Sequence, residues 1–352
     1  MREVNSLAKE LKGVFGWHQA RVVLLAQFMM ALVKVRSSNL AFVAQVFSGS
    51  AQSDSNYKRL QRFLRGFTLD YAQCAKVLAH RLCPDNTWVL CLDRTNWDFG
   101  ITKINFLVLA VAHQGIAIPL FWVLLPKKGN SNTEERKQLI DRFLSVFGVE
   151  KIAYITADRE FRGKDWLQYL VDHQIPFCLR IPNNTKVENK YANRRLPVSR
   201  LFSLRQGEQM SLNKRRSIWG IEVYLSCVLG HKGWVIIASN DQPKTAITRY
   251  AVRWSIETLF GCLKSRGFDL ERTHLRHAER LEKLFFVLAL TFTWCFSLGI
   301  WQNDLKPIRY KKHGRRSVSL FRYGMDYLHR VLLNGHENNS EFTQTLRVLS
   351  CT

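Results

Sequence analysis

The sequence predicts an α/β protein preceded by an all-helical N-terminal domain, and three observations support this prediction. Residues 1–84 place apolar side chains at helical spacing and show no alternating strand pattern. From Thr87 onward, short apolar runs typical of strands alternate with polar segments typical of helices. The 352 residues are 47% hydrophobic, which is enough to build a substantial core.

The N-terminal region, residues 1–84, carries 12 basic and 4 acidic residues. Two helices are expected at 39–47 and 57–67. The second is amphipathic, with Leu60, Phe63, Leu64 and Phe67 on one face and Lys58, Arg62 and Arg65 on another. Because one face can pack while the other meets phosphate, we predict a helical DNA-binding domain in which Arg62 and Arg65 contact phosphate. The alternative is a charged face that is only solvated.

Residues 85–182 are expected to form three strands, a helix, a strand, a helix and a strand. These elements lie at 88–92, 106–112, 116–125, 132–147, 152–156, 163–173 and 176–181. The order describes a mixed sheet with helices on its faces. Residues 183–240 interrupt it with strand candidates at 219–228 and 234–238 and with ten basic and three acidic residues. We interpret this segment as a β-rich insertion.

Helices resume at 246–266, so residues 241–305 are expected to complete the α/β domain. A basic C-terminal segment, 306–352, contains a last helix at 321–333. The run 284–301 has no charge across 18 residues and reaches the minimum length for a membrane span, but its threonines, serine and glycine favour a buried core helix. With no recognisable export signal, we predict a cytoplasmic protein without a membrane partner.

Charge and cysteine usage narrow the class of partner and site. Lys and Arg number 52 against 28 Asp and Glu, which gives a formal charge of +24 and indicates a polyanionic partner. A basic solvated surface or an acidic membrane is the alternative. The eight cysteines contain no Cys-x2-Cys pair, which argues against a common zinc site and against a disulfide scaffold.

Two aspartates follow apolar runs in the same way. Asp93 ends the run that begins at Trp88, and Asp158 ends the run that begins at Ile152. A carboxylate at the end of a buried strand can project into the crevice at the edge of the sheet, where α/β proteins place their sites. For a single aspartate, a position in a turn or at a helix N-cap is an equally good interpretation. The occurrence of two aspartates in the same setting makes this alternative interpretation weaker.

The helix expected at 246–266 contains four residues with the spacing Tyr-x2-Arg-x3-Glu-x6-Lys: Tyr250, Arg253, Glu257 and Lys264. At about 100° per residue, the last three lie within roughly 40° of one another, and Tyr250 lies about 60° from Arg253. All four therefore face one way. Glu257 can reach a metal while the basic residues and the tyrosine hold phosphates.

The Asp-Arg-Thr-Asn-Trp run from Asp93, the Ala-Asp-Arg-Glu-Phe run around Asp158 and the Tyr/Arg/Glu/Lys helix resemble, in this order, the cut-and-paste transposases of the insertion sequence four family. The resemblance implies a ribonuclease-H-like catalytic domain with a β insertion before the helix that carries the glutamate. It also implies that Asp93, Asp158 and Glu257 are the catalytic, metal-binding triad. The expected protein is bacterial and nucleoid-associated, and it acts as a homodimer on double-stranded transposon-end inverted repeats and target DNA.

The chemistry of the triad agrees with this resemblance. Three carboxylates without a His or Cys cluster suit a hard cation, so we predict two Mg²⁺ ions, for which Mn²⁺ substitutes. The close pair His274 and His277 is expected to lie on the surface or to contact DNA. Other acids near the motifs, Asp98, Glu160 and Asp165, are expected to be structural.

In relatives, DNA breakage passes through a hairpin, and an aromatic side chain of the insertion supports a flipped base. The candidates here are Trp234, our first choice, and Trp219, while Trp254 follows Arg253 and is expected to contact DNA. Two other functions stay open. One is a DNA-binding regulator that has lost catalysis, and the other is a stand-alone structure-selective nuclease on the same fold.

Overall fold

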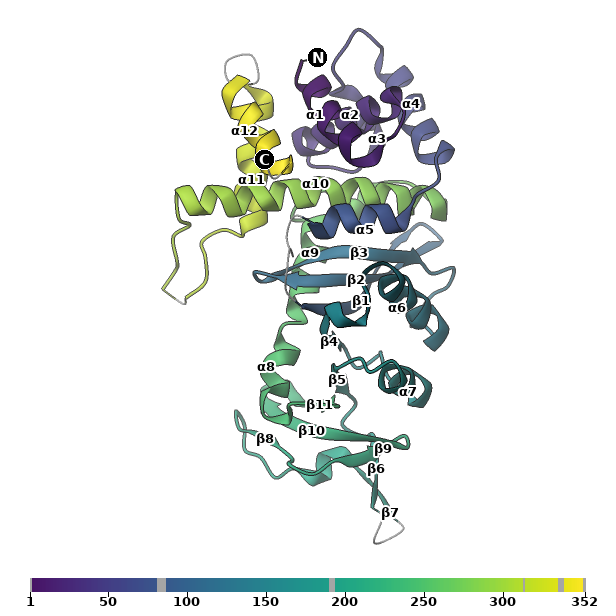
Figure 1. Cartoon of the computed structure of the whole chain (residues 1–352), viewed down its shortest axis with the longest axis vertical. Coiled ribbons are helices and arrows are strands. Elements are labelled where there is room, and N and C mark those ends of the chain that lie inside the picture. Colours follow the sequence, from purple (N-terminus) through teal and green to yellow (C-terminus); the bar gives the residue numbers. More distant parts are fainter. Residues whose placement is uncertain (1, 81–86, 190–193, 313, 335–338, 351–352) are drawn as a thin grey trace. The chain divides into compact units, whose positions relative to one another are not determined.

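A computed structural model describes residues 2–80, 87–189, 194–312, 314–334 and 339–350, and shows a mixed α/β chain with one large sheet and many helices (Figure 1). The α/β prediction is confirmed. The chain divides into two compact units. Unit 1 comprises Met1–Pro84, Trp97–Ile104 and Leu259–Thr352, and unit 2 comprises Asp85–Asn96 and Asn105–Thr258. The predicted boundary at residue 84 lies outside the described residues, and the five-part division stays a prediction.

Unit 1 is mostly helical. Its helices are α1 (Arg2–Phe15), α2 (Gln19–Val35), α3 (Leu40–Gln45), α4 (Ser53–Gly66), α5 (Tyr71–His80), η4 (Leu270–Arg272), α10 (Ala278–Leu305), α11 (Leu320–Leu333) and α12 (Asn339–Ser350). The last helix was not predicted. The pattern missed α12 because few of its residues are apolar, although Phe342, Leu346 and Leu349 are buried.

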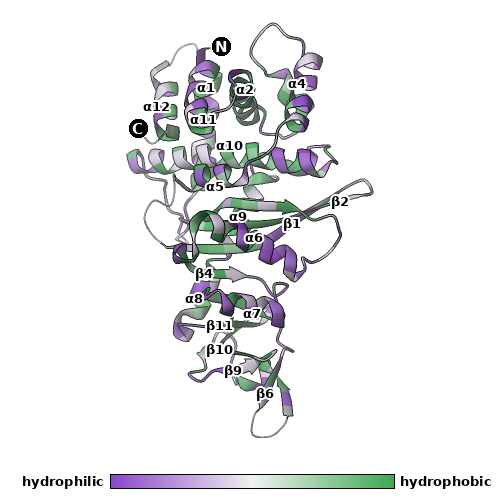
Figure 2. Cartoon of the chain, turned by 45° about the vertical axis from the view of Figure 1, so that its right-hand side comes forward, coloured by the Kyte–Doolittle hydropathy of each residue, from purple (hydrophilic) through white to green (hydrophobic). Residues whose placement is uncertain are grey.

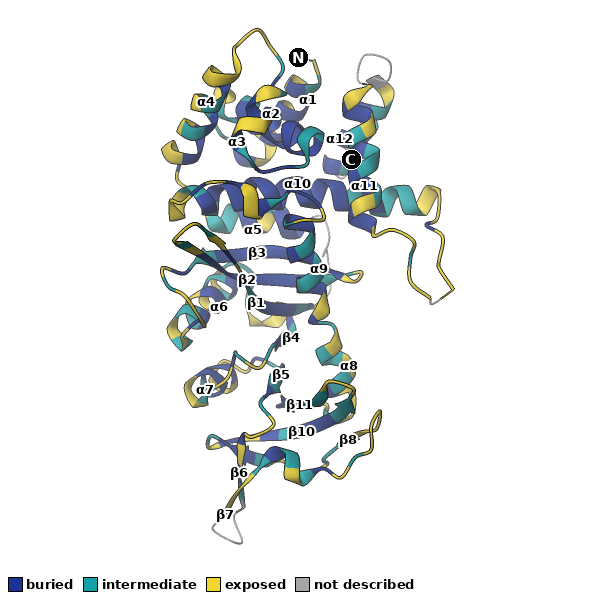
Figure 3. Ribbon diagram, turned by 180° about the vertical axis from the view of Figure 1, so that it is seen from behind, coloured by how far each residue is buried: buried dark blue, intermediate teal, exposed yellow. Residues whose placement is uncertain are grey.

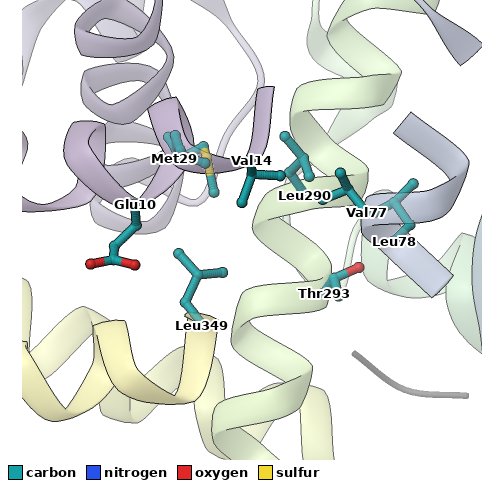
Figure 4. Close-up of a pocket in the computed structure, with 9 residues that line it drawn as sticks. Glu10, Val14, Met29, Val77, Leu78, Leu290, Thr293 and Leu349 are labelled. Atoms are coloured by element: carbon teal, nitrogen blue, oxygen red, sulfur yellow. The ribbon is translucent and has the colours of Figure 1, made fainter. Parts of the chain in front are cut away.

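Helix α10 forms the core of unit 1. Its central residues are almost all buried, as Figure 3 shows in dark blue, in agreement with the predicted core helix. By length and composition alone it could cross a membrane, as could α1 and α2 if that pair, bent by 119°, were one span. The apolar window of α10 is 83% buried inside the protein. An apolar cavity of about 20 Å³ beside it, lined by Met29, Leu290 and Leu349, has room for about one water (Figure 4).

The sheet has eleven strands, and its order is β3-β2-β1-β4-β5-β11-β10-β9-β6-β7, with β8 beside β10. The strands are β1 (Trp88–Phe99), β2 (Thr102–His113), β3 (Ile116–Leu124), β4 (Ile152–Ala157), β5 (Phe177–Ile181), β6 (Lys186–Asn189), β7 (Arg194–Pro197), β8 (Gln209–Ser211), β9 (Arg216–Ile218), β10 (Ile221–Gly230) and β11 (Gly233–Ser239). Strands β1, β4 and β5 run parallel, and β2 with β3 and β5 with β11 are antiparallel. The apolar middle of β2 is green in Figure 2, and the middles of β2 and β3 are buried in Figure 3.

The helices of unit 2 are α6 (Thr133–Phe147), η1 (Val149–Lys151), α7 (Lys164–Asp172), η2 (Val198–Leu201), η3 (Pro243–Thr245), α8 (Ala246–Ala251) and the start of α9 (Trp254–Leu263). Of these, α6 and α7 lie between strands as predicted, and the short 3-10 helices η1, η2 and η3 were not predicted. Asn132 begins α6 with a capping box, since its side chain accepts from the Glu135 N–H and Glu135 accepts from the Asn132 N–H. The insertion is β-rich, and β11 pairs with β5, so its strands continue the main sheet.

Candidate active site

Asp93 and Asp158 lie side by side in the sheet. The parallel pairing of β1 with β4 ends at Leu92 opposite Ala157, so each aspartate is one residue beyond the last pair. Asp158 directly follows β4, as predicted. The prediction that Asp93 ends its strand is wrong, because β1 continues to Phe99 alongside β2. Asp93 nevertheless stands where the β1–β4 pairing stops, at the carboxyl side of that pair.

The single helix predicted at 246–266 is also wrong. It is broken between α8 and α9, and Arg253 lies in the break. The Arg253 N–H donates to the carbonyl of Tyr250 at 2.9 Å, and the Ser255 N–H donates to that of Val252 at 3.0 Å. These bonds reach back three residues instead of the four of an α-helix. The Cys91 thiol of β1 also donates to the Val252 carbonyl at 3.9 Å, so the break is fixed against the sheet.

Helix α8 is anchored on the sheet just before the break. The Cys178 thiol of β5 donates to the carbonyl of Ala246 at 2.9 Å, and the Tyr154 hydroxyl of β4 donates to that of Arg249 at 3.2 Å. The Arg249 guanidinium lies 4.1 Å from the centre of the Tyr154 ring and pairs with Asp241 at 2.7 Å. These contacts hold the residues that follow, Tyr250 to Arg253, over the ends of β1 and β4.

Arg253 joins the predicted acids into one cluster. Its side chain is only 10% exposed. The guanidinium donates from Nη1 to Asp93 Oδ2 at 3.0 Å, from Nη2 to Glu257 Oε1, and from Nε to the Tyr250 hydroxyl at 3.1 Å. The Tyr250 hydroxyl in turn donates to Asp158 Oδ1 at 3.3 Å. Five of the six motif residues therefore meet in unit 2, although the helix that was expected to align them is broken.

Arg180 completes the surroundings of Asp158, and the sequence prediction missed it. Its Nη1 lies 3.5 Å from Asp158 Oδ1. Arg180 is the one charged residue in the otherwise apolar strand β5, which pairs with β4. A charge inside a buried strand next to a candidate catalytic strand was the signal that could have identified it.

A second unpredicted contact joins the residues that follow the two aspartates. Arg94 donates from Nε and Nη2 to the two carboxylate oxygens of Glu160 at 2.5 and 2.7 Å. Arg94 also donates to the Asn105 side chain on β2 at 2.9 Å and to the Gly129 carbonyl at 2.7 Å. Because Arg94 follows Asp93 and Glu160 comes two residues after Asp158, this bidentate pair links the backbones of both acids.

Burial governs the ionisation of the cluster. It raises the pKa of Asp93 to about 7, and the neighbouring Arg253 guanidinium opposes this rise. Burial likewise raises the pKa of Tyr250, which favours the neutral phenol that donates to Asp158. The Asp93 carboxyl is therefore near its pKa at neutral pH, and the Arg253 guanidinium beside it favours the ionised form.

The donor chemistry fits a hard divalent cation, since carboxylate oxygens are the ligands that such ions prefer. Two of the three carboxylates, Asp93 and Glu257, already face one positive charge, that of Arg253. Among the residues that the structure describes, no group of three or more His, Cys, Asp or Glu side chains is arranged to hold a metal ion. The space between Asp93 and Glu257 is taken by the guanidinium.

Comparison with known proteins identifies the family. Residues 86–294, more than half of the chain, match the family described as "Transposase DDE domain". The chain belongs to this family. It is a DNA transposase with a nuclease and strand-transferase type of domain. No curated protein matches it significantly. A piggyBac transposase, solved by cryo-EM as a synaptic complex with hairpin DNA, is similar with 10% identity and a TM-score of 0.48, over 98% of this chain and 78% of that one.

The other residues predicted for the transposase site are not among the hydrogen-bond partners of Arg253, and Lys264, Arg62 and Arg65 belong to unit 1. Lys264 belongs to unit 1, where its Nζ pairs with Glu271 at 2.9 Å and lies 5.6 Å from the centre of the Trp97 ring. Trp254 begins α9 and is 64% exposed. Arg62 and Arg65 lie on the exposed face of α4, whose opposite face buries Leu60, Phe63 and Leu64, as predicted from the amphipathic pattern.

The two tryptophans of the insertion differ in their surroundings. Trp234 is half-buried on β11, opposite Leu229 of β10. Trp219 occupies the first position of a two-residue turn between β9 and β10, with a φ of 51°, and lines a cavity of about 300 Å³. The same cavity is lined by Lys164, Lys186, Glu188, Arg195 and Gly220. A left-handed backbone is uncommon for a bulky residue and is found more often at functional sites.

Proposed function

We propose that this transposase is a cut-and-paste enzyme of the insertion sequence four family, which cleaves transposon ends and transfers their 3′-hydroxyls to target DNA. The convergence of the spaced motifs supports the proposal. Asp93 and Glu257 share the guanidinium of Arg253, and Tyr250 connects Arg253 to Asp158. The mixed sheet, with an insertion before the glutamate, supports a ribonuclease-H-like catalytic domain.

In this proposal Asp93, Asp158 and Glu257 hold two Mg²⁺ ions, and Mn²⁺ substitutes for them. When bound, such ions activate the attacking water or 3′-hydroxyl and stabilise the leaving oxygen. Tyr250, Arg253 and Lys264 hold phosphates. Three of the five N–H groups of Arg253 donate to Asp93, Glu257 and Tyr250, and a phosphate contact by this guanidinium uses the other two. Arg180, beside Asp158, is a further cation near the same acids.

The remaining parts of the proposal concern DNA and assembly. The N-terminal helices recognise the inverted repeats, with Arg62 and Arg65 on phosphate, and two copies of the chain form the synaptic complex. Breakage passes through a hairpin that an aromatic side chain of the insertion stabilises. The protein works in the bacterial cytoplasm, at the nucleoid. Support comes from the high positive charge of the chain and from the exposed basic face of α4.

The test uses the purified full chain, Mg²⁺, duplexes that end in the inverted repeats flanking its gene, and a supercoiled target plasmid. We expect plasmid molecules joined to the 3′ ends of the repeats. A structure-selective nuclease would cut branched DNA without joining it, and a regulator would bind the repeats without cutting. Either result contradicts the proposal.

A further inference from the structure

A groove of about 380 Å³ lies between α4 and the start of α10, within unit 1. Its lining is entirely polar or charged, and consists of Lys58, Gln61, Arg62, Arg65 and Arg280. Figure 2 shows hydrophilic, purple stretches on α4 and on the end of α10 beneath it. The four cations come from segments more than 200 residues apart, so their proximity could not be read from the sequence.

The two walls of the groove are held in place from behind. Lys283 of α10 is 8% exposed, and its Nζ donates to the Arg65 carbonyl at the end of α4 at 3.3 Å. The same ammonium lies 5.2 Å from the centre of the Phe67 ring. On the inner side of α4, Leu60 and Leu64 are fully buried. The basic side chains therefore project from a fixed framework, since a buried cation at a helix C-terminus stabilises the helix junction.

The charge in the groove is uncompensated. Within the described part of the chain, no carboxylate lies within ion-pair distance of Lys58, Arg62, Arg65 or Arg280. The next arginine of α4, Arg59, turns inward instead and donates to the Asn56 and Gln27 side chains. Such a concentration of unpaired positive charge raises the local concentration of anions.

The spacing of these cations matches a nucleic-acid backbone. Lys58, Arg62 and Arg65 follow one another at i, i+4 and i+7, so they share one face and span about 10 Å. Phosphates of one DNA strand rise about 3.4 Å each along the duplex axis, so this face reaches about three of them. Arg280 approaches from the other wall.

We propose that this groove binds the phosphate backbone of duplex DNA, and that Arg280 is one of its contacts together with Lys58, Arg62 and Arg65. The inference rests on the proposed DNA-cutting function and deepens it. With four cations and a single amide lining it, the groove supplies affinity and register, and base recognition belongs to other residues.

The experiment compares full-length Lys58→Gln and Arg280→Gln with a control, Lys9→Gln, which removes an exposed charge from α1. Binding to a labelled random-sequence duplex is measured across a salt series. Each groove variant should lower the slope of log affinity against log salt by about 0.9, and lower affinity about eightfold near 0.1 M salt. The control should leave both unchanged, and Arg280→Lys should restore most of the Arg280→Gln loss.

Melting curves verify that each variant is folded. If folded Lys58→Gln and Arg280→Gln bind duplex DNA like the unaltered protein, the groove proposal fails while the proposed function stands. If the unaltered protein binds no DNA, both fail. A loss of binding to anionic lipid vesicles, with duplex binding unchanged, would assign the groove to a membrane surface and also overturn the proposal.

Discussion

Two regions of the chain concentrate arginine, and they differ in what faces it. In unit 2, Arg253 is buried and donates to Asp93, Glu257 and Tyr250. In unit 1, Arg62 and the other cations of the α4–α10 groove face solvent, and no carboxylate among the residues that the structure describes pairs with them. The first region is charge-compensated and the second is not.

This difference sets how each region responds to substitution. A buried charge is tolerated only with its partners, so removing one member of the Arg253 cluster leaves the others unpaired, and the effects are large and non-additive. Each exposed cation of the groove adds a similar increment to DNA affinity, and salt screens that increment. Substitutions in the groove should therefore lower DNA affinity in additive steps. Substitutions in the two regions should therefore separate DNA cutting from DNA binding.

The largest effect is expected at the triad. Asp93→Ala, Asp158→Ala or Glu257→Ala should reduce Mg²⁺-dependent nicking by on the order of a thousandfold or more, because each removes a metal ligand. Affinity for end DNA should stay nearly unchanged, since it comes from many basic contacts. Nicking gels and gel shifts on the same DNA measure both. Asp98→Ala, which removes an exposed acid paired with Lys103, is the control. Normal nicking by any triad variant would remove that residue from the site.

The next effect is expected for Arg253→Lys. Lysine keeps the charge but cannot donate in a fixed fork to Asp93, Glu257 and Tyr250 at once. With bonds to charged groups worth about 1.5–3 kcal/mol, nicking should fall about ten- to a hundredfold. Arg36→Lys is the control, because Arg36 pairs with Asp326 in unit 1 and is not among the partners of the Arg253 cluster. It should lower the melting temperature without selectively slowing nicking. Equal loss of nicking in both variants would show that only packing matters.

The tryptophans of the insertion give a third contrast. The sequence spacing did not decide which tryptophan supports the flipped base, and Trp234 was our first choice. In the structure, the basic cavity beside Trp219 favours Trp219. Stacking is worth about 1–3 kcal/mol per base, so Trp219→Ala should slow hairpin formation about ten- to a hundredfold while nicked DNA accumulates. Trp234→Ala should mainly lower thermal stability. Denaturing gels beside melting curves distinguish the two. Hairpins formed at the normal rate by folded Trp219→Ala would exclude Trp219, and selective loss in Trp234→Ala would restore the first choice.

The elements that the sequence predicted well are those specified by local patterns. Helix α6 has its capping residues, Asn132 and Glu135, in the sequence, and β4 is an apolar run that stops at Asp158. The separation of Glu257 from the two aspartates also follows from the position of the β-rich insertion. These features need no knowledge of distant contacts.

The features that were missed depend on tertiary contacts. Periodicity continues through Val252 and Arg253, and the break there arises where their neighbours on β1 bind them. Arg94 pairs with Glu160, yet in a chain with 52 Lys and Arg nothing local distinguishes it from basic residues that face DNA. Arg180 stands out as the charged residue of an apolar strand, but only the pairing of β5 with β4 brings it to Asp158. Side-chain direction, which decides between these roles, is set by the fold.

The smallest effect is expected at the Arg94–Glu160 pair, which touches neither the Arg253 guanidinium nor the groove. Glu160→Gln keeps the shape of the side chain but removes its charge, so the bidentate contact between Arg94 of β1 and the segment after β4 weakens. We expect the free energy of unfolding to fall by about 1–3 kcal/mol and nicking to fall only several-fold. Because the two aspartates become less well positioned to bind metal, a higher Mg²⁺ concentration should restore part of the lost nicking. The control Glu134→Gln removes an exposed acid on α6 that pairs with Lys137. If the Glu160→Gln protein melts normally but does not nick DNA at any Mg²⁺ concentration, Glu160 acts directly in the site. The charge-compensated cluster would then include Glu160 as well as the partners of Arg253.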